Sequence, residues 1–160
     1  MNGDLTMESI SDQLLRLLGK PENAPEFQEL LEEIGDAPRT SDLGQDREYG
    51  FDAYGFGLRY DTEQEAFWLV TFEFGVEIVK SASVKPFVGA LPMGLTQVDS
   101  KRDIESKLGV QPIRQQRISK RFERAIFNLP PHRLDCLFDS STFSGLAVHL
   151  LSVRDSLGGE

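Results

Sequence analysis

Two stretches of this chain end a helix in the same way, 74 positions apart. LLEEIGDAP (30–38) and IESKLGVQP (104–112) each read as the last turns of an amphipathic helix, a glycine, two residues and a proline. Glycine readily takes the left-handed conformation that terminates a helix, and proline prevents its continuation. A chain that repeats this ending is expected to repeat the unit to which the helix belongs.

The segments that follow the two helix ends also correspond. Residues 54–61 and 66–74 alternate apolar and polar side chains around a short polar turn, as expected for a hairpin. They align with 132–139 and 144–151 at an offset of 78, so one four-residue insertion reconciles the helix and strand offsets. The matched pairs are Phe56 with Leu134, Leu58 with Cys136, Tyr60 with Phe138, Asp61 with Asp139, Trp68 with Leu146, Val70 with Val148, and Phe72 with Leu150. The pattern predicts an α+β fold, a tandem repeat of a helix followed by antiparallel strands, with one sheet and the helices packed on one face.

A length of 160 residues suits one domain with a sizeable core. We expect a single domain, 1–160, with the first repeat at about 22–75, an ordered connector at 76–98 and the second repeat at 99–153. The connector is too apolar for a flexible linker, so we expect it to be packed. The elements expected from periodicity are helices at 9–21, 24–38 and 99–109, a polar loop at 39–48, and strands at 54–61, 66–74, 124–129, 132–139 and 144–151.

Alternation along the expected strands divides their side chains between two faces. The core face, on which the helices are expected to lie, consists of Phe56, Leu58, Tyr60, Trp68, Val70, Phe72, Leu134, Cys136, Phe138, Leu146, Val148 and Leu150. The opposite face, which we call the open face, consists of Gly55, Gly57, Arg59, Phe67, Leu69, Thr71, Glu73, Arg133, Asp135, Leu137, Ala147, His149 and Leu151. This open face mixes charges with large apolar groups, so it is either paved by loop residues or offered to a partner.

Charge is distributed unevenly along the chain. The net charge is −9, and residues 22–65 hold 13 acidic and 3 basic side chains, whereas 101–124 holds 3 acidic and 8 basic ones. A nucleic-acid-binding domain carries a basic footprint that this chain as a whole lacks, so we expect no nucleic-acid partner. An acidic half favours a basic protein partner and speeds encounter with it. The alternative is that the charge serves solubility alone.

The sequence offers little catalytic or metal chemistry. It has two histidines, His132 and His149, and one cysteine, Cys136, which alternation places among core residues as an inert thiol. We therefore expect no disulfide, no metal, no cofactor and no enzyme activity. No apolar run approaches the roughly 18 residues of a membrane span, and the acidic start MNGDLTMESISDQ does not fit a secretory signal. These features favour a cytoplasmic protein without a membrane partner.

Several short motifs occur in a recognisable order: LLGKP, LLEEIGDAP, YGFGLRYDTEQEAFWLVTFEF, GALPMGL and SKRDIESKLGVQP. Together they resemble, over roughly residues 14 to 151, a family of small bacterial immunity proteins in polymorphic toxin and contact-competition systems. The helix-then-strands tandem is also similar to β-lactamase inhibitor protein and to small lipoproteins of outer-membrane assembly. The chain departs from the lipoproteins because it lacks a lipobox cysteine. The resemblance implies an immunity protein that binds one toxin tightly and has no turnover of its own.

Acidity and this resemblance lead to the hypothesis that the chain occludes the active site of a basic toxin. The residues expected to contact basic groups of the toxin are Asp46, Glu48, Asp52, Asp61, Glu63 and Glu65. Tyr54, Phe67 and Leu69 are expected to supply the desolvated centre where hot spots lie. The rest of the expected binding surface consists of Arg59, Glu73, Asp135 and His149.

Two other functional classes compete with this hypothesis. A non-inhibitory adaptor or effector chaperone would share the fold and the acidity and would bind its partner without blocking it. A small enzyme acting on cationic substrates would need a dry cleft with clustered titrating groups, for example around Asp135 and His149. The sequence leaves open the identity of the partner, the oligomeric state and the role of the basic stretch 101–124.

Overall fold

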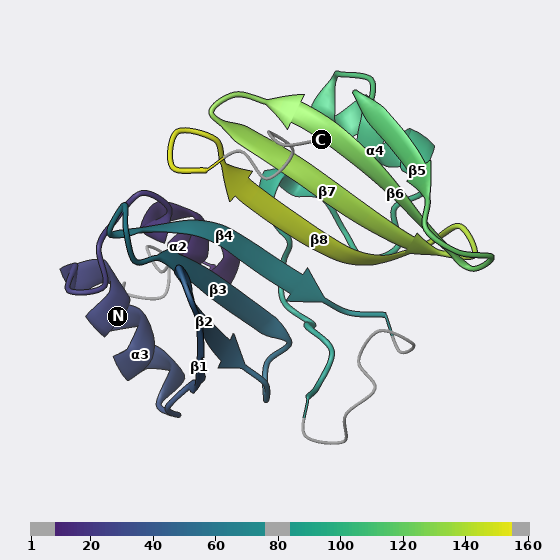
Figure 1. Cartoon of the computed structure of the whole chain (residues 1–160). Helices are drawn as coiled ribbons and strands as arrows, with labels where there is room; N and C mark the ends of the chain where they lie inside the picture. Colours follow the sequence, from purple (N-terminus) through teal and green to yellow (C-terminus); the bar gives the residue numbers. More distant parts are fainter. Residues whose placement is uncertain (1–8, 76–83, 155–160) are drawn as a thin grey trace, which may run out of the picture.

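A computed structural model describes residues 9–75 and 84–154, and its eight strands form one antiparallel sheet. The strand order is β1-β2-β3-β4-β8-β7-β6-β5, so β4 and β8 meet at the centre (Figure 1). The strands are β1 (Arg39–Leu43), β2 (Asp46–Phe51), β3 (Phe56–Asp61), β4 (Ala66–Glu73), β5 (Arg114–Arg117), β6 (Phe122–Leu129), β7 (His132–Asp139) and β8 (Thr142–Leu150). The fold belongs to the α+β class, as the sequence predicts.

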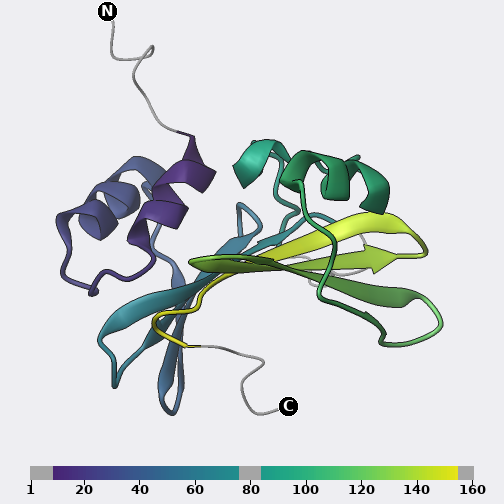
Figure 2. The ribbon, with the colours of Figure 1, turned by 90° about the horizontal axis from the view of Figure 1, so that it is seen from above.

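The helices of the described residues lie on one side of this sheet (Figure 2). They are α2 (Ile10–Leu17), α3 (Pro25–Ile34), the 3-10 turn η1 (Pro92–Gly94) and α4 (Lys101–Leu108). Both α3 and α4 end at a left-handed glycine, with φ of 83° at Gly35 and 73° at Gly109, as the two helix-ending stretches predict. A capping box between Ser100 and Asp103 starts α4. In the part of the chain that the structure describes, no helix is long and apolar enough to cross a membrane.

The two edge strands depart from the sequence prediction. Residues 39–48, expected as a polar loop, instead form β1 and the start of β2, which are joined by a turn at Gly44 and Gln45. Strand β5 has no counterpart among the predicted strands. Both edges are polar, RTSDL in β1 and RQQR in β5. Such sequences protect an edge from pairing with another chain, but they lack the apolar alternation by which a strand is detected.

A β-bulge in β4 changes which side chains face the helices. Arg59 pairs with Leu69 whereas Tyr60 pairs with Phe67, so Trp68 is an extra residue in the ladder. Phe67 therefore lies in the core, 0% exposed, with its ring centroid 5.0 Å from that of Tyr60. Trp68 faces the open side of the sheet, where it contacts His149 and Arg154. The prediction that placed Trp68 in the core and Phe67 on the open face is wrong, because strict alternation does not register a bulge.

One continuous core lies between the helices and the sheet. At its centre Val70 pairs with Val148 and Phe72 with Leu146, so these side chains join the two halves of the sheet. Apart from Trp68 and the half-buried Leu150, every residue predicted for the core face belongs to this core.

The described part of the connector, 84–98, packs against the same core. Its buried side chains are Phe87, Leu91 and Leu95. The ring of Phe87 lies 4.9 Å from that of Phe72, and the backbone N–H of Phe87 donates to the carbonyl of Glu73 at 2.7 Å. The expectation of an ordered connector also covers residues 76–83, which lie outside the described residues.

Candidate functional site

The open face is the side of the sheet that the helices leave uncovered (Figure 2). One segment returns over it: after β8 the chain turns at 151–153, and the guanidinium of Arg154 lies 4.5 Å from the centre of the Trp68 ring. A short piece of the chain therefore covers part of this face. No sequence motif indicates this cover, because Arg154 follows the last expected strand outside any periodic pattern.

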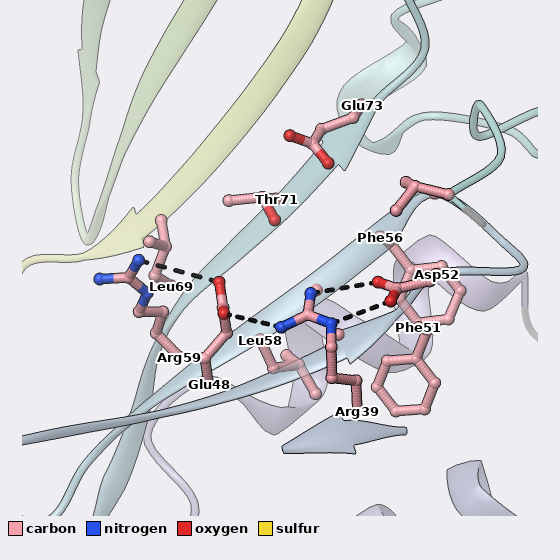
Figure 3. Close-up of a pocket in the computed structure, with 14 residues that line it drawn as sticks. Arg39, Glu48, Phe51, Asp52, Phe56, Leu58, Arg59, Leu69, Thr71 and Glu73 are labelled. Carbon is pink, nitrogen blue, oxygen red and sulfur yellow. Dashed lines mark hydrogen bonds and ion pairs between the residues drawn. The ribbon is translucent and has the colours of Figure 1, made fainter. Parts of the chain in front are cut away.

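A hollow of about 220 Å³ lies in the open face of β1–β4 (Figure 3). Gly50 of β2 pairs with Gly57 of β3, and since glycine has no side chain, neither strand fills the space above this point. A Cβ atom at Gly50 would lie 2.3 Å from a guanidinium nitrogen of Arg39, which occupies that space. The polar and apolar side chains around the hollow include Arg39, Glu48, Asp52, Arg59, Leu69, Thr71 and Glu73.

A chain of ion pairs borders the hollow (Figure 3). Glu48 lies 3.8 Å from a guanidinium nitrogen of Arg59 and 3.2 Å from one of Arg39. Arg39 also donates two hydrogen bonds to Asp52, at 2.9 and 3.1 Å. The hydrogen bond to Asp52, followed by that to Glu48, raises the pKa of Arg39. The carboxylates of Glu48 and Asp52 are thus paired within the chain, and they fix the shape of the hollow.

Glu73 brings a carboxylate to the hollow that forms no ion pair with any other described residue. Desolvation, followed by the neighbouring carboxylates of Glu48 and Asp52, raises the pKa of Glu73, and Arg39 partly opposes the shift. Glu73 is an exposed residue at the end of β4, so its carboxylate can be reached by a cation from solvent. The hollow therefore suits the positively charged end of a side chain.

Three side chains beside the hollow enclose the guanidinium of Arg154, and we call them the arginine cage: Asp46, Asp61 and Trp68. One nitrogen of Arg154 lies 2.8 Å from Asp46 and the other 2.6 Å from Asp61, while the guanidinium carbon lies over the Trp68 ring, 4.5 Å from its centre. Trp68 also donates its indole N–H to Asp46 at 3.3 Å. The other carboxylate oxygen of Asp46 lies 3.5 Å from Arg59, which links the cage to the hollow.

Asp61 is the most enclosed member of the cage, with 1% of its surface exposed. One of its oxygens accepts from the backbone N–H groups of Glu63 and Gln64, at 2.9 and 2.8 Å. The other accepts from the side chains of Gln45, at 3.0 Å, and Arg154. Desolvation acts to raise the pKa of Asp61, but the N–H of Gln64 and the guanidinium of Arg154 outweigh it, so that this pKa is lowered.

A second depression, of about 360 Å³, adjoins the hollow on β6–β8. It shares Thr71 and Glu73 with the hollow, and its lining includes Arg124 and Asp135, which form two hydrogen bonds at 3.2 and 2.5 Å. Ile118, an exposed apolar side chain, lies at its margin. The remaining lining is mostly small or apolar, so this depression offers little charge to a ligand.

The predicted site residues separate into three groups. Those that line the hollow or the second depression are Glu48, Asp52, Arg59, Leu69, Glu73 and Asp135. Those in or beside the arginine cage are Asp46, Asp61 and His149, whose ring lies 5.7 Å from that of Trp68. Those away from both are Tyr54, Glu63, Glu65 and Phe67, of which Glu63 and Glu65 are exposed in the turn between β3 and β4.

Tyr54 and Phe67 do not lie on the open face as expected. Tyr54 belongs to the turn after β2, which carries it to the helix side, where its hydroxyl donates to Asp36 at 3.1 Å and it lines a pocket with Ile34. Phe67 is in the core because of the bulge. Asp135 and His149 also do not share one cleft, because the depression that Asp135 lines does not include His149.

Sequence reasoning missed three residues of this face: Arg39, Trp68 and Arg154. Arg39 lay in an expected loop, and Trp68 was assigned to the core by alternation. Arg154 meets Asp61 across 93 positions, a contact that no local pattern indicates.

Other reactive groups are few in the described residues. Across 9–75 and 84–154, no three His, Cys, Asp or Glu side chains are grouped so that they could hold a metal ion. Cys136 is buried, and desolvation, with a smaller contribution from Asp135, raises the pKa of its thiol far above the usual value. A thiol whose pKa is raised in this way is a poor nucleophile. Desolvation lowers the pKa of His132.

No protein-family model and no curated protein matches this chain. Among solved structures, it is similar to a DUF4309 family protein (YjgB) from Bacillus subtilis subsp. subtilis str. 168. That likeness has a TM-score of 0.45 and 12% sequence identity, and it covers 77% of this chain and 76% of the other. A likeness of this degree assigns the chain to no family.

Proposed function

We propose that this chain binds a basic protein on the open face of its sheet, and that this partner is a toxin whose active site it covers. The observation that carries the proposal is the hollow. The carboxylate of Glu73 lies in its wall, and Arg39 is ion-paired with Asp52 and Glu48 at its border. A lysine or arginine of the partner that enters the hollow would meet the exposed carboxylate of Glu73, which forms no ion pair with any other described residue.

The charges available to a partner differ from those expected at the outset. Asp46, Asp52 and Asp61 are engaged in ion pairs within the chain, so they shape the surface and contribute less attraction. Glu63 and Glu65 form no ion pair with other described residues and would steer a basic partner toward the face. Leu69 and Thr71, beside the hollow, would form the desolvated centre of the interface.

The experiment starts with the chain tagged in its own cells, followed by capture of its partner and a toxicity test of that partner. The proposal requires a basic protein that is lethal when expressed alone and harmless when expressed with this chain. Thr71→Arg then fills the centre of the open face and is expected to weaken the complex about 100-fold, since it places a bulky cation in the interface. Cells that express the toxin together with Thr71→Arg should therefore no longer be protected.

The matched control is Ser106→Arg, which adds the same charge to the exposed surface of α4, on the helix side of the sheet. This variant should bind and protect as the wild-type chain does. Equal effects of the two substitutions would show that the open face is not the binding surface. A partner that binds tightly but is not toxic, or is not inhibited, would favour the adaptor or chaperone class. A toxin of this kind would be met in the cytoplasm, where we place the chain.

We also propose that the two halves are copies of one unit. Besides the helix ends at Gly35 and Gly109, each half has a bulge near the same point: the register shifts after Arg59 in β3–β4 and after Leu137 in β7–β8. Counted from the bulges, Phe67 corresponds to Phe143, an offset of 76 and not 78. The turn at 140–141 is two residues shorter than the turn at 62–65, which accounts for the difference.

A further inference from the structure

The arginine cage is held in place without help from Arg154. Three donors other than Arg154 orient Asp61, namely the N–H groups of Glu63 and Gln64 and the side chain of Gln45. Asp46 accepts a hydrogen bond from the indole N–H of Trp68 and lies 3.5 Å from a guanidinium nitrogen of Arg59. A site whose groups are oriented before the ligand arrives loses little entropy on binding.

Arg154 reaches the cage from a short turn after β8. Among the described residues, its backbone N–H donates to the carbonyl of Leu150 at 3.2 Å, and the start of the turn is tied by the N–H of Leu151, which donates to the carbonyl of Pro131 at 3.0 Å. The side chain of Arg154 remains 26% exposed. The guanidinium can therefore leave the cage by a change in its own side chain or in residues 152–154, beyond the hydrogen bond of Leu151, and the sheet beneath can stay as it is.

We propose that the arginine cage is a binding site for an arginine side chain of the protein partner, and that Arg154 fills it while the partner is absent. This inference rests on the proposed function for the nature of the partner, a basic protein on the open face. The partner's arginine would stack on Trp68 and bond to Asp46 and Asp61, as Arg154 does. Arg154 then acts as an internal competitor that is displaced on binding.

The chemistry of the cage selects arginine over lysine. A guanidinium is planar, stacks on an indole ring and can bond two carboxylates in different directions at once, whereas an ammonium is a compact, strongly hydrated charge. The aromatic platform also sets the two halves apart. The extra residue of the bulge is Trp68 in β4 but Ser144 in β8, where the hydroxyl bonds to the carbonyl of Thr142 at 2.9 Å.

The test uses Trp68 as the reporter, since it is the single tryptophan of the chain. The probe is arginine capped at both ends as N-acetyl-arginine amide, titrated into the full chain while tryptophan emission is followed. In Arg154→Ala the cage is empty, and the emission should change saturably with the probe. In the wild-type chain the tethered Arg154 competes at a high effective concentration, so the apparent affinity should be at least about tenfold weaker.

Two controls separate cage binding from a general charge effect. Lysine capped in the same way should bind Arg154→Ala at least about tenfold more weakly than capped arginine, because it cannot stack and bond two carboxylates together. Arg124→Ala removes an arginine of similar exposure from its pair with Asp135 on the same face but leaves the cage filled. This variant should respond as the wild-type chain does.

The proposal is overturned if folded Arg154→Ala shows no saturable response, or responds no better than the wild-type chain, since Arg154 would then be a structural staple. An equal response to capped lysine would overturn it too. Should Arg154→Ala fail to fold, Arg154→Lys serves instead: it keeps a charge beside Asp61 but lacks the planar group, so capped arginine should displace it more readily than it displaces Arg154. No gain in affinity over the wild-type chain would then count against the site.

A second copy of this chain is the rival occupant, since it could offer its own Arg154 to the cage. Sedimentation of the wild-type chain decides between them: a dimer that Arg154→Ala dissolves would assign the cage to self-association and overturn a partner site. These results are independent of the toxin. A cage that fails to bind capped arginine leaves the hollow and the Thr71→Arg test standing, and failure of the latter leaves the cage result unchanged.

Discussion

The two halves of the sheet share a plan but differ at one kind of position, the extra residue of the bulge. In both halves a helix ends at a left-handed glycine, a four-stranded meander follows, and the ladder slips near the end of the third strand. The slip buries Phe67 in one half and Phe143 in the other. The extra residue, however, is a tryptophan in β4 and a serine in β8. The same backbone irregularity thus carries an aromatic ring that packs against Arg154 in one half and a small hydroxyl side chain in the other.

The two phenylalanines that the bulges bury have similar surroundings in the two halves. Phe67 lies among aromatic rings, with centroids 4.9 Å from Phe27 and 5.0 Å from Tyr60. Phe143 lies 5.5 Å from Phe138 and 5.0 Å from Phe74. Both sites are closed, with exposures of 0% for Phe67 and 3% for Phe143, whereas the extra residue of each bulge differs in kind.

The largest expected effect comes from the two buried phenylalanines. Phe67→Ala and Phe143→Ala should each lower the free energy of unfolding by about 4 kcal/mol, because each leaves a cavity in a closed core. Urea denaturation of the two variants measures this. Similar losses would support the equivalence of the bulges. A loss below about 1 kcal/mol for Phe67→Ala would place its side chain on the open face and contradict the bulge.

A smaller difference is expected between two glycines with nearly the same backbone conformation, φ of 76° at Gly55 and 73° at Gly109. A Cβ at Gly55 would lie 2.3 Å from the backbone nitrogen of Phe87, whereas one at Gly109 would meet nothing within 4 Å. Gly55→Ala should therefore cost about 3 kcal/mol, the strain plus a displaced connector. Gly109→Ala should cost about 1 kcal/mol, the conformational strain alone.

Thermal and urea denaturation of both glycine variants, side by side, give the comparison. Equal losses would show that the connector at Phe87 moves aside freely, and the packing of the connector would then contribute little to the fold.

Local patterns were enough to predict the elements that bury one apolar side. The ends at Gly35 and Gly109, both central hairpins and the bounds of β7 follow from periodicity and from the conformations that glycine and proline favour. The polar edges β1 and β5 escaped prediction because water on both sides removes the alternation that marks a strand. A bulge inside β4 then reversed the assignment of Phe67 and Trp68.

The candidate site was predictable in its acidity but not in its geometry. Asp46, Glu48, Asp52 and Asp61 were expected to face a partner, yet each is paired with an arginine of the same chain. Such pairs join residues distant in sequence, and their formation depends on a register that the sequence does not specify locally. The arginine cage depends on two features that local sequence does not indicate. One is the bulge that turns Trp68 to the open face, and the other is the contact of Arg154 with Asp61.

The smallest expected loss of stability concerns the two aspartates that end the third strand of each half, Asp61 and Asp139. Asp61 is paired with Arg154 and almost fully buried, whereas Asp139 is paired with Arg121, whose side chain is half exposed. Asp61→Asn should lower the free energy of unfolding by about 2 kcal/mol at pH 7, because buried hydrogen bonds to a charged acceptor are weakened. Asp139→Asn should cost less than about 1 kcal/mol, as is usual for an exposed pair.

Acid separates the two aspartates further. The pKa of Asp61 is lowered in the folded chain from its usual 3.8, so its contribution to stability is present above about pH 4 and is lost as the pH falls through the folded pKa. Urea denaturation in buffers from pH 7 to 3 should thus show a constant gap between the wild-type chain and Asp61→Asn down to about pH 4, and a narrowing gap below it. A gap that stays constant to pH 3 would mean that Asp61 stabilises the fold through its shape and neutral hydrogen bonds, and the electrostatic account of the cage would fail at its most buried member.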